Sequence, residues 1–406
     1  MNDSKIINDP IFGFIKIPHG LLLNIVEHPL MQRLTRIKQL GLTLMVYPSA
    51  QHTRFQHSLG AFHLMSEAIT SLTQKGIFIF DSEAEAVEAA ILMHDIGHGP
   101  FSHVLEHTLI NGICHEEISL LMMEQINREM NGELNLALKI FKNEYPKRFL
   151  HQLISSQLDM DRLDYLRRDS FYTGVTEGNI GSARIIKMLD VHNDSLVVNS
   201  KGIYTIENYL MARRLMYWQV YLHKTTVSSE KMLVNALMRA KQLAHNGKDI
   251  FATPSLKYFL YNDIDAETFK KDEDAQRHYA ILDDNDIISS IKVWTENDDK
   301  VLSILASDII NRKIFKVEIY NEPISDNYIK SKKHQIADKL CISEDEANFL
   351  ISVDTVQKDM YDIHDDHITI LFKDNITKDI SESSEVLNIA LLSKKIRKYY
   401  LCYQRF

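Results

Sequence analysis

The stretch EAEAVEAAILMHDIGHGPFSH, which starts at Glu83, constrains the fold more than any other part of the sequence. Strong helix formers with acidic residues in the first turns predict a helix, and the glycines and proline of residues 97–100 predict its end. His94 and Asp95 then lie in the last helical turn, directly after an apolar run. An imidazole and a carboxylate at the negative end of a helix dipole can bind one cation together. The chain is therefore expected to end a core helix at a polar site.

Helical periodicity extends over most of the chain, as far as about residue 315. With only 14 Gly and 8 Pro among 406 residues, the chain has little material for turns, and this also favours helices. We therefore predict a mainly α fold with a helical core over residues 1–315. Besides the helix described above, the clearest helical patterns cover 27–41, 57–75, 115–130, 150–169, 204–245 and 301–312.

Residues 316–406 differ from this core in composition. KIFKVEIY (313–320) and HITILFK (367–373) alternate as strands around a helical SEDEANFLIS segment, which predicts a smaller α+β C-terminal lobe. Within the core, SLVVNSKGIYTI predicts a β-hairpin around residues 199–202, because β-branched and aromatic residues lie on both sides. The polar DDNDIISS segment near residue 283 is expected to be a loop.

Charge and cysteine content restrict the class of protein. The net charge of −9 argues against a general nucleic-acid or membrane-surface binder, since either needs a basic face. Cys114, Cys341 and Cys402 are widely spaced, so neither a disulfide framework nor a thiolate zinc site is indicated. A run of about 18 apolar residues and a secretory leader pattern are both lacking. We expect a cytoplasmic protein that does not enter a membrane.

Histidine is concentrated in one region, because eight of the histidines fall within residues 52–115. Any one of them alone is better explained as a partly buried core histidine, whereas the cluster indicates a metal site. His94 and Asp95 need further ligands, and His57 and Asp161 are candidates on other helices, as in helix-bundle metal sites. Spacing alone does not select these two from competing residues.

The motifs around these residues, taken in order, resemble one family. His57, the His94-Asp95 pair and Asp161 are similar to the signature of the HD-domain phosphohydrolases, whose name comes from the His-Asp pair. The resemblance is to the deoxynucleoside-triphosphate triphosphohydrolase branch, and it runs from about residue 5 to 245 and more weakly to about 320. The pair alone is a weak signal, whereas the ordered blocks are a strong one. These blocks are INDPIFGFIKIP, QRLTRIKQLG, YPSAQHTRFQHSLG, MHDIGHGPFSH, HEEIS and DMDRLDYLRRDS.

The resemblance implies an HD-domain helical core in which His57, His94, Asp95 and Asp161 hold one divalent metal. Three or four protein ligands leave positions for water and a substrate oxygen, as a catalytic site requires. The metal would lower the pKa of a bound water and polarise a phosphoryl oxygen. Its identity stays open among Mn, Fe, Mg, Zn and Ni.

The resemblance also implies contacts to a triphosphate, whose charge needs local cations in an acidic protein. It assigns Arg54, Arg162 and Arg213 to phosphate contacts, and a solvated surface arginine is the alternative for each. Position 162 is arginine where the family usually has lysine, which keeps the charge but changes the hydrogen-bond geometry.

One helical stripe is expected to face the sugar. Arg162, Tyr165 and Asp169 lie at i, i+3 and i+7, on one side of a helix. By resemblance, Tyr165 packs under the sugar where a 2′-hydroxyl would clash, and Asp169 binds the 3′-hydroxyl together with Gln39. The resemblance therefore implies a preference for deoxyribose.

A second stripe is expected on a single helix over 204–245, where Arg213, Tyr217, Tyr221 and Lys224 lie at i, i+4, i+8 and i+11. By resemblance, Tyr221 matches the tyrosine on the base and sugar side of the nucleotide. An amphipathic core helix with aromatic packing is the alternative interpretation.

The residues after the His-Asp pair are candidates for proton transfer. Hydrolysis at the α-phosphorus leaves a 5′-oxygen that needs a proton, and histidine can give one near neutral pH. We predict His103 as that acid. His98, His115 and Glu116 are expected to orient it or to bind phosphate oxygens.

The resemblance thus implies metal-dependent hydrolysis of dNTPs to deoxynucleoside plus inorganic triphosphate. One alternative is an HD phosphatase or phosphodiesterase acting on a monophosphate, a cyclic dinucleotide or an alarmone, although Gln39, Tyr165 and Asp169 favour deoxyribose. The other is a nucleotide-sensing or single-strand nucleic-acid-binding protein with little turnover, against which the intact ligand positions argue.

Members of this branch are often oligomers, and a homotetramer with a dNTP effector is the expectation for this chain. The KIINDPIFG segment and the QRLTRIK helix, with Arg33, Arg36 and Lys38, resemble regions used for effector binding. Thr35 stands where some relatives have an effector-binding arginine, and Glu27 where an acidic base-reading residue occurs. A solvated amphipathic helix is the alternative for QRLTRIK.

Overall fold

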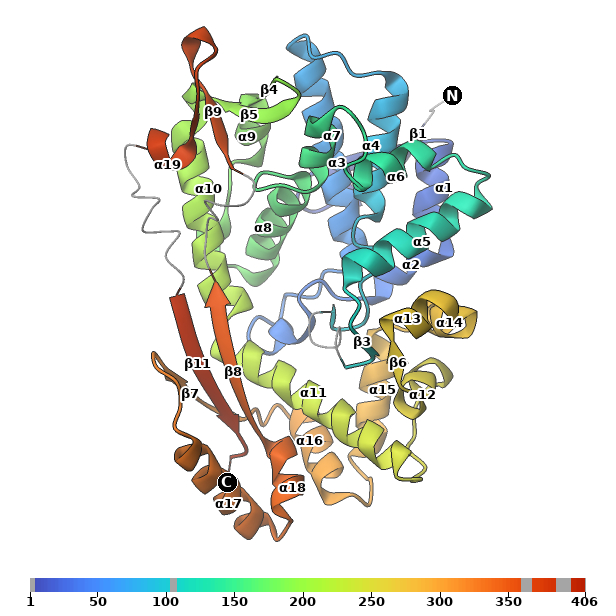
Figure 1. Cartoon of the computed structure of the whole chain (residues 1–406), viewed down its shortest axis with the longest axis vertical. Helices are drawn as coiled ribbons and strands as arrows, with labels where there is room; N and C mark the ends of the chain where they lie inside the picture. Colours follow the sequence, from blue (N-terminus) through green and yellow to red (C-terminus); the bar gives the residue numbers. More distant parts are fainter. Residues whose placement is uncertain (1–3, 103–107, 359–366, 385–395, 406) are drawn as a thin grey trace.

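The computed structural model describes residues 4–102, 108–358, 367–384 and 396–405. The fold is mainly α, which confirms the predicted class, and its strands form small sheets (Figure 1). The described helices are α1 (Leu21–Glu27), α2 (Pro29–Arg33), α3 (Arg54–Gln74), α4 (Asp81–Met93), α5 (His115–Glu129), α6 (Asn135–Phe141), α7 (Arg148–Ile154), α8 (Met160–Thr173), α9 (Ser182–Met188), α10 (Ile203–Met216), α11 (Lys224–His245), α12 (Pro254–Tyr261), α13 (Ala266–Lys271), α14 (Glu273–Ile281), α15 (Asp284–Trp294), α16 (Lys300–Ile310), α17 (Asp326–Leu340), α18 (Glu344–Ala347) and α19 (Ile380–Ser383).

The strands pair as β1-β2, β10-β9-β5-β4, β7-β11-β8 and β3-β6. C-terminal strands enter two of these sheets, because β9 pairs with β5 in parallel while β7, β11 and β8 form an antiparallel sheet of their own. In Figure 1 that sheet lies with α17 at the lower end of the molecule, and β9 lies beside β5 at the upper end. The predicted boundary at residue 315 stays a prediction. The strands are β1 (Ser4–Asp9), β2 (Gly13–Pro18), β3 (Ile110–Asn111), β4 (Leu189–His192), β5 (Ser195–Asn199), β6 (Ile264–Asp265), β7 (Lys316–Tyr320), β8 (Ile351–Lys358), β9 (Thr369–Leu371), β10 (Thr377–Asp379) and β11 (Ile396–Tyr403).

Three helices that are far apart in the sequence form the centre of the fold, since α3 packs against both α4 and α8. α3 begins with a capping box in which Thr53 and Gln56 each accept a hydrogen bond from the other's backbone N–H. α8 begins after the cap Asp159 and ends at Thr173, and the C-cap Gly174 has the left-handed φ of 74° typical of a helix C-terminus. α4 ends at Met93. These caps fix which residues stand at the helix ends.

The predicted hairpin at residues 199–202 is wrong. The antiparallel partner of β5 is β4, and the turn between them uses Asn193 and Asp194, both with positive φ. After Gly202 the chain enters α10, whose Ile206 and Leu210 are fully buried at helical spacing. Burial of this helical face outweighs the local β propensity of the sequence.

The predicted loop near residue 283 is also wrong, because it forms the start of α15. Asp283 and Asp286 make a capping box, so the acidic residues belong to a helix N-terminus. Ile287, Ile291 and Trp294 then place the apolar face of α15 in the core.

The helix predicted over 204–245 is interrupted. α10 ends at Met216, Tyr217–Tyr221 form a π-helical turn, and α11 starts at Lys224. Lys224 is exposed, so the second stripe ends at Tyr221. π-Helical turns often occur at functional sites. The range 150–169 is divided as well, between α7 and α8.

In the parts of the chain that the structure describes, every helix is too short or too polar to cross a lipid bilayer.

Candidate metal centre

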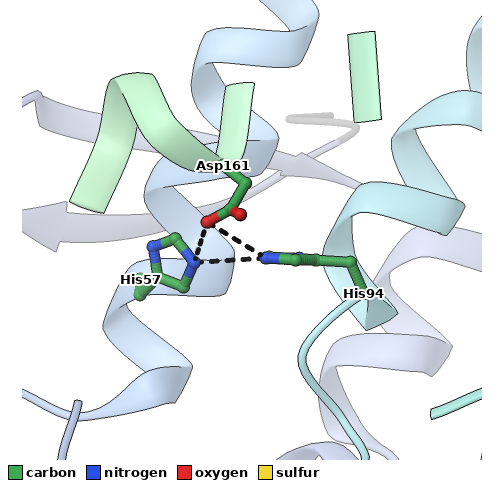
Figure 2. A group of neighbouring side chains, drawn as sticks. All are labelled: His57, His94 and Asp161. Atoms are coloured by element: carbon green, nitrogen blue, oxygen red, sulfur yellow. Dashed lines mark hydrogen bonds and ion pairs between the residues drawn. The ribbon is translucent and has the colours of Figure 1, made fainter. Parts of the chain in front are cut away.

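Three of the four predicted ligands converge from α3, the end of α4 and the first turn of α8 (Figure 2). His57 Nε2 lies 3.2 Å from His94 Nε2 and 3.1 Å from Asp161 Oδ1. His94 Nε2 lies 3.6 Å from the same Asp161 oxygen. Two imidazole nitrogens and a carboxylate oxygen are a common ligand set for divalent transition metals.

Hydrogen bonds orient both imidazoles. His57 Nδ1 bonds to Asp164 Oδ2 at 2.7 Å, and His94 Nδ1 bonds to the carbonyl oxygen of Ile91 at 2.6 Å. Both partners can only accept, so each Nδ1 carries the proton and the Nε2 of the neutral ring carries a lone pair. Two lone pairs 3.2 Å apart beside a carboxylate need a proton or a cation between them. This arrangement of donors fits a divalent metal.

The charges around the cluster also favour a cation. Burial alone would lower the pKa of His57, but hydrogen bonds to Asp161 and Asp164 outweigh it and raise that pKa to about 10. Burial favours protonation of Asp161, yet the two imidazoles hold its pKa far below the ordinary value. Without metal the cluster therefore binds protons, which an incoming metal must displace.

Asp164 belongs to a buried ion pair that sequence reasoning missed. Arg168 donates to both Asp164 oxygens, at 2.9 and 3.0 Å, and to Asp9 Oδ2 at 2.8 Å. A Cβ on Gly60 would lie 1.9 Å from Asp164 Oδ1 and 2.2 Å from Arg168 Nη2. This close approach explains a glycine inside α3, where it costs about 1 kcal/mol relative to alanine. The i, i+4 spacing of Asp164 and Arg168 is a signal that could have revealed the pair.

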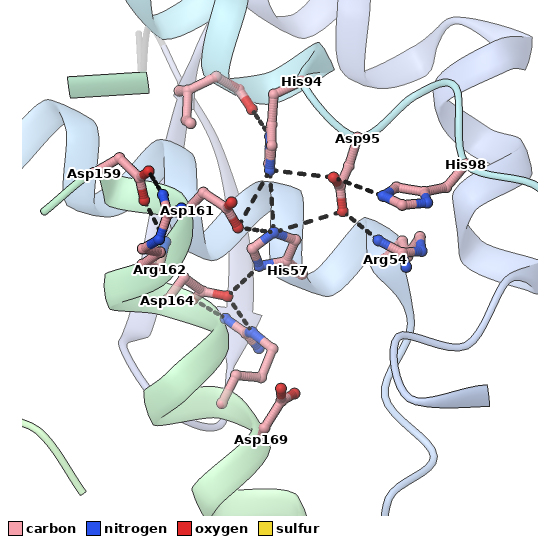
Figure 3. A network of polar contacts seen from close by, with 12 residues as sticks. Arg54, His57, His94, Asp95, His98, Asp159, Asp161, Arg162, Asp164 and Asp169 are labelled. Atoms are coloured by element: carbon pink, nitrogen blue, oxygen red, sulfur yellow. Dashed lines mark hydrogen bonds and ion pairs between the residues drawn. The ribbon is translucent and has the colours of Figure 1, made fainter. Parts of the chain in front are cut away.

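Asp95, the fourth predicted ligand, lies beside the cluster (Figure 3). Its oxygens are 3.5 Å from His94 Nε2 and 3.7 Å from His57 Nε2. It also accepts from Arg54 Nη1 at 2.6 Å and lies 3.2 Å from His98 Nε2. Burial favours protonation of Asp95, but its interactions with His98, His94 and Arg54 hold its pKa well below the ordinary value. Its role as a ligand stays a prediction.

The predicted proton-transfer residues form a second group next to Asp95. His98 stacks on His115 with ring centroids 3.8 Å apart, and both line a cleft with Tyr279. Burial and the Arg54 charge hold the pKa of His98 well below its ordinary value. The Glu116 side chain is 71% exposed and lies 3.9 Å from His115 Nε2. His103 falls outside the described residues.

The three predicted phosphate-binding arginines have partners of their own. Arg54 is paired with Asp95, Arg162 donates to Asp159, and Arg213 Nη1 donates to Gln157 Oε1 at 2.7 Å. The Nε atoms of Arg54 and Arg213 are buried, and neither has a hydrogen-bond partner among the described residues. Such donors can be satisfied by a bound anion.

A row of aromatic rings leads from the metal cluster to Asp169. The His57 and Tyr165 rings are 6.5 Å apart between centroids, and the Tyr165 and Tyr221 rings are 6.2 Å apart. Tyr221 Oη donates to Asp169 Oδ2 at 2.7 Å. Gln39 joins this end through His52, whose carbonyl accepts from Gln39 N at 3.0 Å.

The start of α15 holds two segments of the site together. Asp284 accepts from Lys38 N at 2.9 Å and from Phe101 N at 3.1 Å. Burial raises the pKa of Asp284 to about 6, against the effect of these hydrogen bonds. Asp284 thus ties the segment that carries Gln39 to the turn after His98. Sequence reasoning missed this residue because it placed the stretch in a loop.

Two family models match the helices that carry the site. One, described as HD domain, matches residues 54–169, and the other, described as HD associated region, matches residues 180–253. The first match spans the segment from Arg54 in α3 to Asp169 in α8.

Individual proteins are also similar to this chain. The crystal structure of a phosphohydrolase from Bacteroides thetaiotaomicron VPI-5482 is 66% identical, with a TM-score of 0.97 over 99% of this chain and 100% of that one. The uncharacterized protein YwfO of Bacillus subtilis (strain 168) is 33% identical over 79% of this chain and 73% of that protein. The deoxynucleoside triphosphate triphosphohydrolase SAMHD1 homolog of Dictyostelium discoideum is 32% identical over 59% of this chain and 50% of that protein.

Proposed function

This chain belongs to the HD-domain phosphohydrolase family, and from that premise we propose that it hydrolyses dNTPs to deoxynucleoside and inorganic triphosphate. The observation that carries the proposal is the convergence of His57, His94 and Asp161 beside Arg54, at one end of the row of rings that leads to Asp169. The likeness to the SAMHD1 homolog supports a dNTP as the substrate.

His57, His94, Asp95 and Asp161 are the proposed ligands of one divalent metal. A divalent cation bound there supplies Lewis acidity and lowers the pKa of a bound water. The two imidazoles favour Mn, Fe, Ni or Zn over Mg, which prefers oxygen ligands.

The surrounding side chains bind the triphosphate and move protons. Arg54 and Arg213 offer buried N–H groups without partners among the described residues, and Arg162 adds a third guanidinium beside Asp161. Water adds to the α-phosphorus and the bond to the 5′-oxygen breaks, so that this oxygen takes up a proton. We assign that proton to His103, with His98, His115 and Glu116 as its supporting groups.

The sugar and base lie along the aromatic row in this proposal. Tyr165 blocks a 2′-hydroxyl, and Asp169 and Gln39 bind the 3′-hydroxyl. Tyr221 both holds Asp169 and packs against the nucleoside.

Product analysis tests the proposal directly. The full chain is incubated with each dNTP, singly and in pairs, with Mn²⁺ or Mg²⁺, and the products are separated by chromatography. Release of deoxynucleoside and triphosphate supports the proposal. The matched control for variants of the metal ligands is Asp249→Asn, which changes a carboxylate that is 92% exposed. Release of pyrophosphate or monophosphate indicates another HD phosphatase or phosphodiesterase. Salt-dependent oligonucleotide binding without hydrolysis indicates a nucleic-acid-binding protein.

A homotetramer activated by a dNTP effector remains part of the proposal. Light scattering with and without dNTPs measures the assembly, and hydrolysis that needs a second dNTP establishes activation. A monomer with full activity on a single dNTP would contradict this part alone.

A further inference from the structure

His52, just before α3, is buried and held by α8 in two ways. Its Nε2 bonds to Asp169 Oδ1 at 2.7 Å, and its ring stacks on Tyr172 with centroids 4.5 Å apart and planes 17° apart. Asp169 and Tyr172 are three residues apart and so lie on the same side of α8. His52 Nδ1 is buried without a hydrogen-bond partner among the described residues, so no second bond of the ring competes for its orientation.

Asp169 is itself fixed by two donors. It is 1% exposed, and it accepts from His52 on Oδ1 and from Tyr221 on Oδ2, both at 2.7 Å. A carboxylate oxygen has two lone pairs, so each oxygen can accept one further hydrogen bond. The protein therefore holds this carboxylate in one orientation. Each of its oxygens can still accept a hydrogen bond from a ligand.

His52 also touches the other proposed sugar residue. Its carbonyl oxygen accepts from Gln39 N, and Gln39 Oε1 is a buried acceptor without a partner in the described part of the chain. His52 thus contacts Asp169 through its side chain and Gln39 through its main chain. Acceptors that lack donors select a ligand group with an O–H or N–H.

We propose that His52 is a positioning residue whose imidazole aims Asp169 at one sugar hydroxyl, and so gives the protein its preference for nucleotides with a 3′-hydroxyl. This inference rests on the proposed function, in which Asp169 and Gln39 bind that hydroxyl. A hydrogen bond to a charged group contributes a factor of about 10 to 100 in affinity. Misalignment of Asp169 should therefore weaken the binding of nucleotides that carry the hydroxyl and leave the binding of those that lack it unchanged.

The test compares dGTP with 2′,3′-dideoxyGTP on the full chain carrying His52→Leu or His52→Gln. Leucine cannot donate to Asp169, whereas the glutamine amide can. For His52→Leu we expect kcat/KM for dGTP to fall about 10- to 100-fold, while the value for dideoxyGTP stays within about twofold. His52→Gln should keep most of the discrimination. His63→Leu, a change at a partly buried histidine of α3 that packs on Phe12, is the control.

Calorimetric binding of both nucleotides in EDTA gives a readout that needs no turnover. The same loss of discrimination by His52→Leu is expected there. Equal losses for both nucleotides would assign His52 a purely structural role and overturn the inference, as would a wild type that binds both equally. A wild type that prefers dGTP in binding but hydrolyses no dNTP would refute the proposed hydrolysis and leave the inference on His52 standing.

Discussion

Two histidine–carboxylate pairs connect the start of α3 to α8. They differ in which partner, the imidazole or the carboxylate, is left able to bind a ligand. His52 pairs with Asp169 and His57 with Asp164, so residues five apart on one segment meet residues five apart on the other. In the His57 pair the carboxylate is fixed by Arg168, and the imidazole is left with Nε2 in the metal cluster. In the His52 pair the imidazole and a tyrosine fix the carboxylate.

The difference lies in how the buried charge is balanced. Asp164 has a guanidinium on both oxygens, so it is a stable anchor that can orient a metal ligand. Asp169 has an imidazole and a phenol as donors instead, which leaves it able to accept from a ligand. In our proposal, the same pair of residue types serves a metal cation in one place and a sugar hydroxyl in the other.

Asp161→Ala should have the largest effect. That effect should fall on the metal cluster that contains His57 and not on the His52–Asp169 pair. It removes a proposed metal ligand, and we expect turnover to fall by more than about 100-fold, the upper end for loss of a residue that only supports a ligand. Discrimination between dGTP and dideoxyGTP in EDTA should stay at the wild-type level. Unchanged turnover would remove Asp161 from the metal site.

Gly60→Ala should act on the His57 pair through stability. The added Cβ would meet the Asp164–Arg168 ion pair at 1.9 and 2.2 Å, and breaking a buried pair costs about 3–5 kcal/mol of unfolding free energy. Urea unfolding measures the loss. Gly181→Ala, where the new Cβ meets only Arg184 Cβ at 3.9 Å, is the control. Equal stability of both variants would contradict the packing described here.

Asp164→Asn should weaken metal binding by about 10- to 100-fold, because the residue orients His57 and the amide lacks the charge that Arg168 needs. Asp169→Asn is the matched change in the other pair and should leave metal affinity unaltered. Metal titration of chelator-treated protein measures both. Similar losses in the two variants would show that the pairs do not have separate roles.

The smallest expected effect is the change in stability and in metal affinity per pH unit. Without metal, the His57 pKa of about 10 lies above its ordinary 6.5, so protonated His57 stabilises the folded state. This contribution is fully present below about pH 6.5 and is lost as pH rises through 10. Metal must displace the proton, so apparent metal affinity should rise with pH by up to about tenfold per unit in this window. Metal titrations and EDTA melts at several pH values check both trends, and a flat profile would contradict them.

Local sequence signals predicted much of the metal centre but little of the structure that surrounds it. The end of a helix at His94 follows from residues 83–100 alone, and the motif order pointed to His57 and Asp161. The predictions of a hairpin at 199–202 and of a loop near 283 were wrong. Local β propensity favoured the first and local polarity the second, whereas burial of apolar residues at helical spacing makes both segments enter helices. The π-helical turn at Tyr217–Tyr221 was missed because it has no periodicity of its own.

The sequence by itself determined the helical class and the family motifs, since helix ends and ligand spacing are properties of neighbouring residues. Only the tertiary structure decided that His57 meets Asp164 and that His52 meets Asp169, across 107 and 117 residues of chain. Such contacts depend on how α3 packs against α8, and that packing is set by buried shape, including the missing side chain at Gly60.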